Sequence, residues 1–386
     1  MNQTRREFLR FGAAVSGLAL TGWTALRRDP NEEGRLAALR FLDRAQSPSG
    51  SWRSARYAVF RSGEVLTPVV LWALSAGPIP SPFAAMQSRA LHWLEGLTDL
   101  AARREQPWTH LPYPLFTASY AAQALAANGD PERAALWAET IESLQTSPEL
   151  GWSPSDPACG AWSDSPVPPH RPASGEALPD MIVPNLSATV LAMQAFLATG
   201  RGHKARAALQ FVEKCQNYGA SGDGGFFFTP EDPIRNKAGI AHRELPGADQ
   251  IRSYGSTTCD GLLALKACGL PSETPRCQAA LGWLEQNADG LAHSGDWPTD
   301  RAAGKESLVF YHAQALAAVL TGYAEKTAWA TVQRKRLQRD LLARQNTDGS
   351  WANAAPDSCE DEPLLATAFA FHALNSGRSS LAAVRG

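Results

Sequence analysis

The sequence predicts an all-α protein, an (α/α)6 toroid in which six helix pairs close into a ring. Two observations predict this fold: a short motif recurs along the chain, and an apolar helical segment follows each copy. The composition agrees with a globular protein, because 44% of the 386 residues are hydrophobic and 19% are charged. Disordered chains have the opposite balance.

The motif is clearest near the two ends of the chain. Residues 41–52 and residues 340–351 both contain Leu-x-x-x-Gln-x-x-x-Gly-x-Trp. Glycine can take a positive φ at the end of a helix, and glutamine can bond the exposed carbonyls there. We therefore expect Gln and Trp to hold neighbouring repeats together. Four weaker copies end at the following aromatic residues: Trp108, Trp152, Phe226 and Trp297.

Each copy of the motif joins two helices of different character. The first is amphipathic, as in residues 204–214, and the second is apolar almost all round. A helix that is apolar all round must be buried on both sides, so six buried helices should lie inside six half-exposed ones. The expected inner helices cover residues 66–75, 116–127, 185–198, 257–267, 308–322 and 364–375.

The first 30 residues are predicted to be an export signal rather than part of the fold. Arg5 and Arg6 precede an apolar run over residues 11–26, as in a twin-arginine signal. An amphipathic N-terminal helix is the alternative. No clear Ala-x-Ala cleavage site follows, so an uncleaved signal can anchor the protein, and no other membrane contact is expected. The predicted location is beyond the cytoplasmic membrane, periplasmic or membrane-anchored.

The formal net charge of -2 argues against nucleic acid as a partner, since phosphate binding needs a basic surface. Six cysteines are scattered along the chain without a Cys-x-x-Cys pair. Disulfides are allowed in an exported protein, and buried free thiols are the alternative.

The repeated motif resembles the Gln-Trp repeat of squalene-hopene cyclases and of protein prenyltransferase β-subunits, the terpene cyclase toroid family. The resemblance covers residues 34–378, which we take as one domain followed by a tail, residues 379–386. It implies the (α/α)6 toroid. It also suggests an axial cavity for an apolar, isoprenoid or lipid-like ligand. Aromatic residues at or on the inner helices are expected to line this cavity: Tyr254, Phe310, Tyr311 and Phe371.

The cyclases that this motif resembles protonate an alkene with an aspartic acid from an Asp-x-Asp-Asp motif, and this sequence has no such motif. The candidate acids are Asp260, Asp361 and Glu362. Adjacent carboxylates raise the pKa of at least one of them, which suits a general acid. Acidic residues before Pro363 can equally serve as a helix cap.

The prenyltransferases that the motif resembles bind zinc through an Asp, a Cys and a His. Here Cys259, Asp260 and His312 are the corresponding candidates. The order Cys-Asp departs from the family's Asp-x-Cys, and an exported chain would not meet the cytosolic substrate. We therefore expect no cofactor, and a core cysteine and histidine are the alternative.

Three classes of function fit these observations. The first is an isoprenoid- or lipid-processing enzyme. The second is a non-catalytic module that binds an apolar or peptide ligand. The third is a carbohydrate-active (α/α)6 enzyme, which needs a pair of carboxylates. The candidates for that pair are Glu64, Asp180, Asp260 and Asp361.

Overall fold

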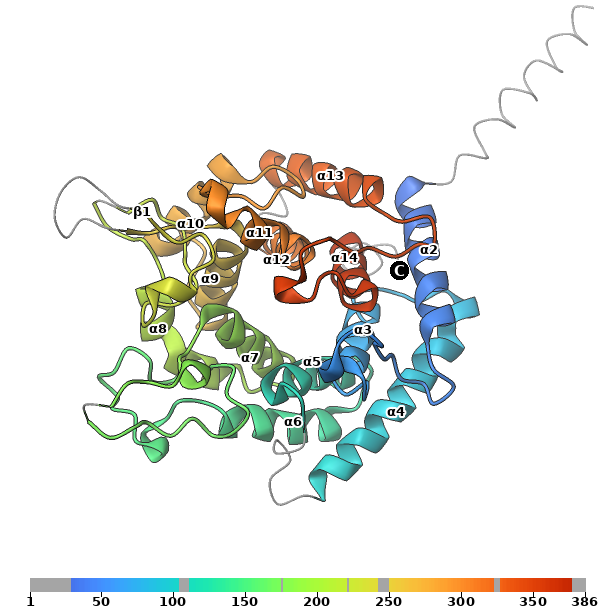
Figure 1. The fold of residues 1–386 in the computed structure, drawn as a ribbon, viewed down its shortest axis with the longest axis horizontal. Helices are drawn as coiled ribbons and strands as arrows, with labels where there is room; N and C mark the ends of the chain where they lie inside the picture. The colour runs from blue at the N-terminus through green and yellow to red at the C-terminus, as the bar shows by residue number, and fades with distance from the viewer. Residues whose placement is uncertain are drawn as a thin grey trace, which may run out of the picture.

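The computed structural model describes residues 29–103, 111–174, 176–220, 222–241, 250–322 and 327–376. Residues 1–28 of the predicted twin-arginine signal, Trp108 and the tail 379–386 lie outside the described residues, whereas Pro30, placed in the signal by the prediction, already begins the first described helix. The described part contains thirteen α-helices in two concentric layers (Figure 1) and one short hairpin, β1 (Ile240–Ala241) and β2 (Gln250–Ile251). The predicted all-α toroid is confirmed.

Six helices form the inner layer, and each packs against the next until the last returns to the first. These helices are buried along nearly their whole length, as their apolar sequences predict. In chain order they are α3 (Leu66–Leu74), α5 (Pro114–Ala127), α7 (Leu186–Ala198), α9 (Gly255–Ala267), α12 (Val309–Gly322) and α14 (Pro363–Asn375).

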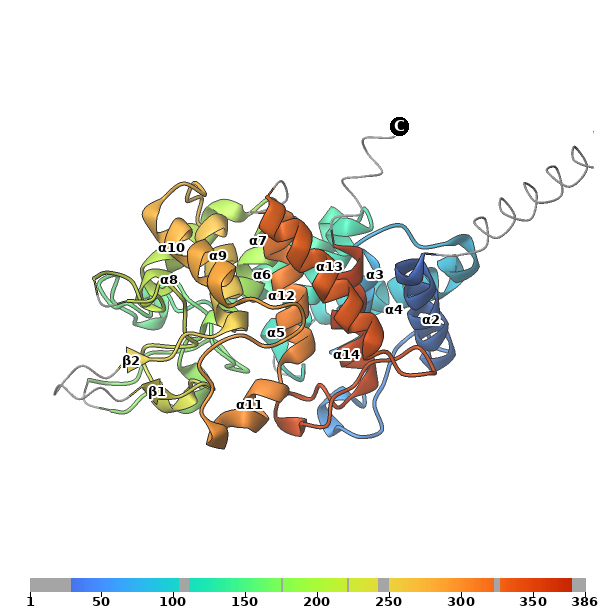
Figure 2. The ribbon, with the colours of Figure 1, turned by 90° about the horizontal axis from the view of Figure 1, so that it is seen from above.

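The outer layer covers the inner helices and closes between the two ends of the chain (Figure 2). Its helix α2 packs against both α13 and α14, and the Gln345 side chain donates to the Gly34 carbonyl at 2.9 Å. The outer elements are α2 (Pro30–Ala45), α4 (Ala84–Ala102), α6 (Pro131–Ser143), the 3-10 segment Gly202–Ala208 with α8 (Leu209–Lys214), α10 (Pro275–Asn287) and α13 (Ala328–Ala343). A short helix, α11 (Ala302–Glu306), precedes α12.

Four turns between outer and inner helices share one hydrogen-bond pattern, and we call them the Gln-aromatic turns. In each turn a glutamine Nε2 donates to the carbonyl of the turn glycine, at 2.7 to 3.0 Å. The pairs are Gln46–Gly50, Gln145–Gly160, Gln216–Gly224 and Gln345–Gly349. All four glycines have φ between 87° and 93°. A Cβ on any of them would lie 2.2 to 2.6 Å from a carbonyl oxygen of the next outer element, so only glycine fits.

The aromatic residue two positions after each of these glycines is fully buried. Its backbone N–H donates to a threonine hydroxyl near the start of the inner helix, at 3.0 to 3.2 Å. The pairs are Trp52–Thr67, Trp162–Thr189, Phe226–Thr258 and Trp351–Thr367. The indole N–H of each tryptophan also donates to a carbonyl at the end of the preceding outer helix. The glutamines Gln46, Gln216 and Gln345 also donate to a carbonyl of the next outer helix, so the predicted role of Gln as a contact between repeats is confirmed there. The bonds of the tryptophans instead join the outer and inner helix of one pair.

The third turn differs from the sequence prediction, which placed its aromatic residue at Trp152. Gln145 bonds Gly160, 15 residues away, whereas Gln46 bonds Gly50, 4 residues away. The long insertion contains Gly151-Trp152, which copies the motif by sequence, but Trp162 makes the contact with the inner helix.

The fifth turn has no aromatic residue in this position. Gly290 has φ 57°, and a Cβ there would lie 2.3 Å from the Asp340 side chain on α13, the next outer helix. The residue two positions later is Ala292. Trp297, the predicted aromatic residue of this repeat, instead lies against the rings of Tyr254 and His293, with centroids 5.2 and 4.9 Å away.

All six cysteines are free thiols, and four of them are buried. Within the described ranges, no helix combines the length and the apolar character needed to cross a membrane.

Candidate functional site

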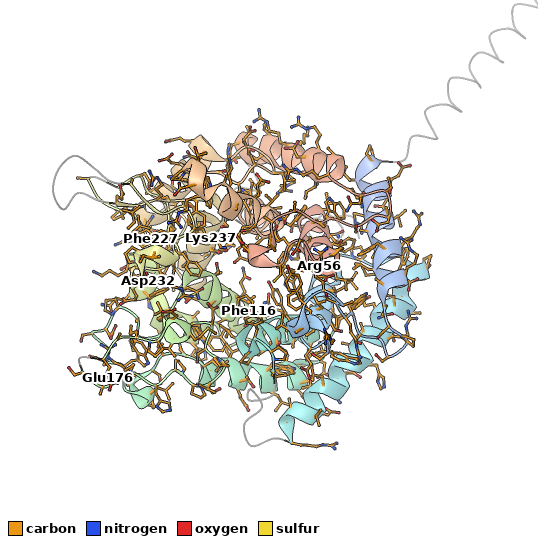
Figure 3. All side chains as sticks on the ribbon, in the orientation of Figure 1. Arg56, Phe116, Glu176, Phe227, Asp232 and Lys237 are labelled. Carbon is orange, nitrogen blue, oxygen red and sulfur yellow. The ribbon has the colours of Figure 1, made fainter. Side chains whose placement is uncertain are left out.

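A cavity of about 360 Å³ lies where the inner helices begin. Residues from the first turns of all six inner helices, or from the loops before them, line it. Figure 3 shows two of them, Phe116 and Lys237, toward the centre of the ring. The apolar part of the wall is mostly aromatic and includes Phe60, Phe116, Tyr120, Phe228, Leu365 and Phe369.

Of the four aromatic residues expected at the cavity, Tyr254 and Tyr311 line it, and Phe310 and Phe371 are buried in the core beside it. On α14, helix periodicity explains the difference, because residues two positions apart lie on nearly opposite faces of a helix. Phe369 faces the cavity, and Phe371 faces the outer layer, where the Arg35 guanidinium lies 6.0 Å from its ring centroid.

Asp260, on α9, lies where three neighbouring inner helices meet. Its Oδ2 accepts hydrogen bonds from the Ser187 hydroxyl on α7 at 3.0 Å and from the Tyr311 hydroxyl on α12 at 2.9 Å. Both donors line the cavity, and Asp260 lies directly behind them with 1% of its surface exposed. Among the described residues, none bonds its Oδ1.

Burial raises the pKa of Asp260 to about 7, although the hydrogen bonds from Tyr311 and Ser187 act in the opposite direction. Burial and the nearby Asp260 also raise the pKa of the Tyr311 hydroxyl well above its usual value, so this donor keeps its proton. A carboxylic acid with a pKa near neutrality can hold a proton and release it to a ligand.

Glu360 lines the cavity as well, and the sequence analysis did not select it. Its carboxylate accepts the backbone N–H of Phe310 at 2.9 Å and that of Tyr311 at 2.6 Å, and the Asn353 amide donates to it at 3.0 Å. Burial raises the pKa of Glu360 to about 8, and the backbone donors oppose this shift. Because every neighbour in these bonds is a donor, Glu360 caps α12 and fixes the position of Tyr311.

The other two predicted acids do not line the cavity. Asp361 pairs with Arg56 and accepts the Tyr57 hydroxyl at 2.5 Å, which raises the pKa of Tyr57. Glu362 accepts the Ser54 hydroxyl and the Leu364 backbone N–H, so it caps α14. Their positions match the helix-cap alternative more closely than the acid hypothesis.

The remaining polar part of the wall comes from two loops. Lys237 Nζ donates to the Ser358 hydroxyl at 3.1 Å, and burial lowers the pKa of this lysine while Asp357 and Glu360 oppose the shift. In the described ranges, the two non-glycine residues with positive φ are Tyr113 and Cys359, at 48° and 58°. Both line the cavity, as expected if backbone strain is concentrated at functional sites.

The three zinc candidates, Cys259, Asp260 and His312, are all buried. Burial raises the pKa of the Cys259 thiol well above its usual value, so it is not a thiolate. No group of three or more His, Cys, Asp or Glu side chains within the described ranges is arranged to hold a metal ion. Of the carboxylates considered for sugar chemistry, Glu64 and Asp180 do not line the cavity.

No protein-family model matches the chain, and no curated protein matches it by sequence. Solved structures do match. The type II terpene cyclase MstE from Scytonema, without ligand, aligns with a TM-score of 0.56 and 14% identity, covering 90% of this chain and 97% of that one.

A variant of that enzyme in complex with geranylgeranyl dihydroxybenzoate, its substrate, aligns with a TM-score of 0.57 and 14% identity, covering 90% of this chain and 96% of that one. A protein from Actinoplanes aligns with a TM-score of 0.57 and 15% identity, covering 90% and 99% of the two chains. The fold is that of a terpene-cyclase-like toroid.

Proposed function

We propose that this toroid binds an isoprenoid-like apolar ligand in its axial cavity and that Asp260 protonates it. One observation carries the proposal: a buried carboxyl with a raised pKa lies directly behind the wall of an aromatic cavity, with two cavity-lining hydroxyls bonded to it. The similarity in fold to a cyclase whose bound substrate carries a geranylgeranyl group supports this choice of ligand.

The proposed chemistry is general acid catalysis on an alkene. Asp260 lies behind the wall, so its proton reaches the ligand through the Ser187 hydroxyl. Ser187 gives its own proton to one carbon of a double bond and takes the carboxyl proton from Asp260, and the positive charge develops on the other carbon. Aromatic faces such as those of Phe116, Phe228 and Phe369 stabilise a cation inside the cavity. After rearrangement or ring closure, the Ser187 hydroxyl takes a proton from the product and passes its own proton to the Asp260 carboxylate, which returns to its starting state.

The test is incubation with geranylgeranyl dihydroxybenzoate and with geranylgeraniol in D₂O, followed by mass spectrometry. An acid that exchanges with solvent puts one deuterium into the product. Asp260→Asn should lower turnover by at least about 100-fold, the smaller end of what a general acid contributes. The matched control is Asp361→Asn, which changes a carboxylate outside the cavity and should keep turnover unchanged.

The outcomes separate the functions that the fold allows. Binding of these ligands without any conversion by the native protein would overturn the acid role and leave a binding module. Equal turnover in Asp260→Asn and the native protein would also overturn the acid role. Failure of both ligands to quench the cavity's tyrosine fluorescence would overturn the choice of ligand.

We further propose that the protein is exported by the twin-arginine route, on the basis of Arg5 and Arg6 before an apolar run. Changing both arginines to lysine should leave the precursor in the cytoplasm, as measured by cell fractionation and immunoblotting. Normal export of the double variant would show that another signal directs it.

A further inference from the structure

The fifth turn of the ring places two histidines next to the cavity wall. His312 is the fourth residue of α12, the position that Thr189 has in α7 and Thr258 has in α9. His293 follows Ala292, which stands where the other turns have an aromatic residue. The two imidazole rings stack with centroids 4.9 Å apart and an interplanar angle of 26°. This turn therefore has Ala292 in place of the aromatic residue, with His293 directly after it, and His312 in place of the threonine.

His293 is bonded to Ser256, which lines the cavity from the first turn of α9. The distance from Ser256 Oγ to His293 Nε2 is 3.1 Å, and the Ser256 backbone N–H donates to the same nitrogen at 3.3 Å. A backbone N–H can only donate, so Nε2 carries no proton. The proton of the ring is then on Nδ1, which donates to the Lys305 carbonyl at 3.0 Å.

This geometry has the three parts of an activated nucleophile: a hydroxyl, a base within hydrogen-bond distance, and a third group that orients the base. Ser256 and His293 are 1% and 2% exposed, so their hydrogen bond is sheltered from bulk water. Burial and the neighbouring His312 lower the pKa of His293 well below its usual value. The resting ring is therefore neutral, with Nε2 placed to accept the Ser256 hydroxyl.

Two features hold the pair in place. Gly255 precedes the serine, and a Cβ there would lie 2.6 Å from the His312 ring, so the close approach requires glycine. The Gly255 N–H donates to the Ser294 carbonyl at 2.8 Å, and Tyr254 pairs with Gly295, which fixes the His293 segment against the start of α9. The His312 ring lies between Gly255 and His293.

We propose that Ser256 and His293 form a nucleophile and its base, and that they cleave an apolar carboxylic ester bound in the cavity. This inference rests on the proposed role of the cavity in binding apolar ligands, and it adds a second chemistry one helical turn from Asp260. The substrate class is an ester whose apolar acyl or prenyl part fills the aromatic wall.

The reaction is acyl transfer through the serine. Ser256 Oγ attacks the carbonyl carbon while its proton moves to His293 Nε2. The bond between that carbon and the alcohol oxygen breaks, and the imidazolium returns the proton to the leaving oxygen. Water then attacks the acyl carbon and gives its proton to His293. The bond to Oγ breaks as Oγ regains that proton, which releases the acid.

The experiment uses the full chain with two probes, a long-chain alkyl fluorophosphonate and p-nitrophenyl decanoate. The native protein should be phosphonylated on Ser256, as located by peptide mass spectrometry, and should hydrolyse the ester. Ser256→Ala should abolish both signals. His293→Gln keeps a hydrogen-bonding side chain and should lower both rates at least about 100-fold, a typical contribution of a general base. His92→Gln is the matched control, because His92 is 90% exposed on α4.

Other outcomes would overturn the inference. Labelling of Ser358, the cavity serine bonded to Lys237, would assign the nucleophile to a different pair. Equal rates in His293→Gln and the native protein would show that the histidine is not the base. Absence of labelling, while geranylgeraniol still binds, would overturn the Ser256 role alone. If neither geranylgeraniol nor the ester binds, both this inference and the proposed function fail.

Discussion

The fifth and sixth turns of the ring contain the same Gly-x-Trp sequence and use it differently. In the sixth turn, Gly349 lies against α2 and Trp351 is fully buried with both of its N–H groups bonded. In the fifth turn, it is Gly290 that lies against the next outer helix, α13, and Gly295-Asp296-Trp297 follows five residues later. There the Trp297 ring packs on Tyr254 and His293 at the cavity end of the molecule.

The comparison shows that one repeat of the ring can lack the buried aromatic residue and the threonine that the other described turns share. In the Gln-aromatic turns, a buried ring and a threonine join the two helices of one pair, and the glycine lies against the next outer element. The fifth turn keeps the glycine contact with the next outer helix but replaces the ring with Ala292 and the threonine with His312. The chain after it is then available to place His293 beside Ser256. We expect mutations in the sixth turn to change stability and mutations around the fifth turn to change chemistry.

The largest expected effect comes from removing the sixth-turn tryptophan. Trp351→Ala should lower the free energy of unfolding by about 3–5 kcal/mol, because it empties a fully buried site and removes two hydrogen bonds that join α13 to α14. Trp297→Ala should cost about 1 kcal/mol, the order of an aromatic pair contact. Urea unfolding followed by circular dichroism measures both. Equal losses at the two positions would contradict the division of roles between the turns.

A second expected effect concerns the glycines. Gly349 has φ 93°, and a Cβ there would lie 2.2 Å from the Ala37 carbonyl oxygen. Gly349→Ala should therefore destabilise the protein by at least about 1–3 kcal/mol. Gly282 lies inside α10 with nothing within 4 Å of an added Cβ. Gly282→Ala should raise stability by about 0.5–1 kcal/mol, since alanine favours a helix. Thermal unfolding should show opposite signs for the two variants.

The sequence predicts the ring well because the motif that defines it is also the contact that closes it. Gln, Gly and Trp recur at fixed spacing wherever the turn is short, and the turns at Gly50 and Gly349 match residue by residue. The prediction misplaces the aromatic residue where the turn is long or altered. Trp152 and Trp297 match the motif by sequence, but the partner threonine and the next outer helix decide which residue makes the contact.

The site was harder to predict, for geometric reasons. Asp260, Tyr254 and Tyr311 were selected because they lie at the starts of inner helices, and that is where the cavity lies. Glu360 was missed although it precedes Asp361. Cys359 has φ 58°, and this left-handed residue turns the loop so that Glu360 faces inward and Asp361 faces Arg56. A sequence pattern does not show which of three adjacent carboxylates a loop turns inward.

A third expected effect is a pH dependence of the free energy of unfolding, which arises from Asp260 beside the cavity. The pKa of Asp260 is raised to about 7 in the folded protein, and in the unfolded chain it is about 4. The folded state therefore binds more protons between these two values, and this residue makes stability fall as pH rises through that window. The slope from one such group is at most about 1.4 kcal/mol per pH unit. Asp260→Asn should remove this component, as measured by urea unfolding from pH 4 to pH 8. An unchanged slope would show that Asp260 is ionised in the folded protein.

The smallest expected effect is at Asp361, which lies beside the cavity acids in sequence but pairs with Arg56 and Tyr57 in the structure. The Arg56 side chain is 56% exposed, so the ion pair is screened by solvent and is worth about 1 kcal/mol or less. Asp361→Asn also keeps an oxygen that can accept the Tyr57 hydroxyl. The variant should therefore unfold within about 1 kcal/mol of the native protein and show the same pH slope. A loss of stability as large as that of Trp351→Ala would contradict this prediction. It would mean that the loop before α14 contributes as much to closing the ring as the turns do.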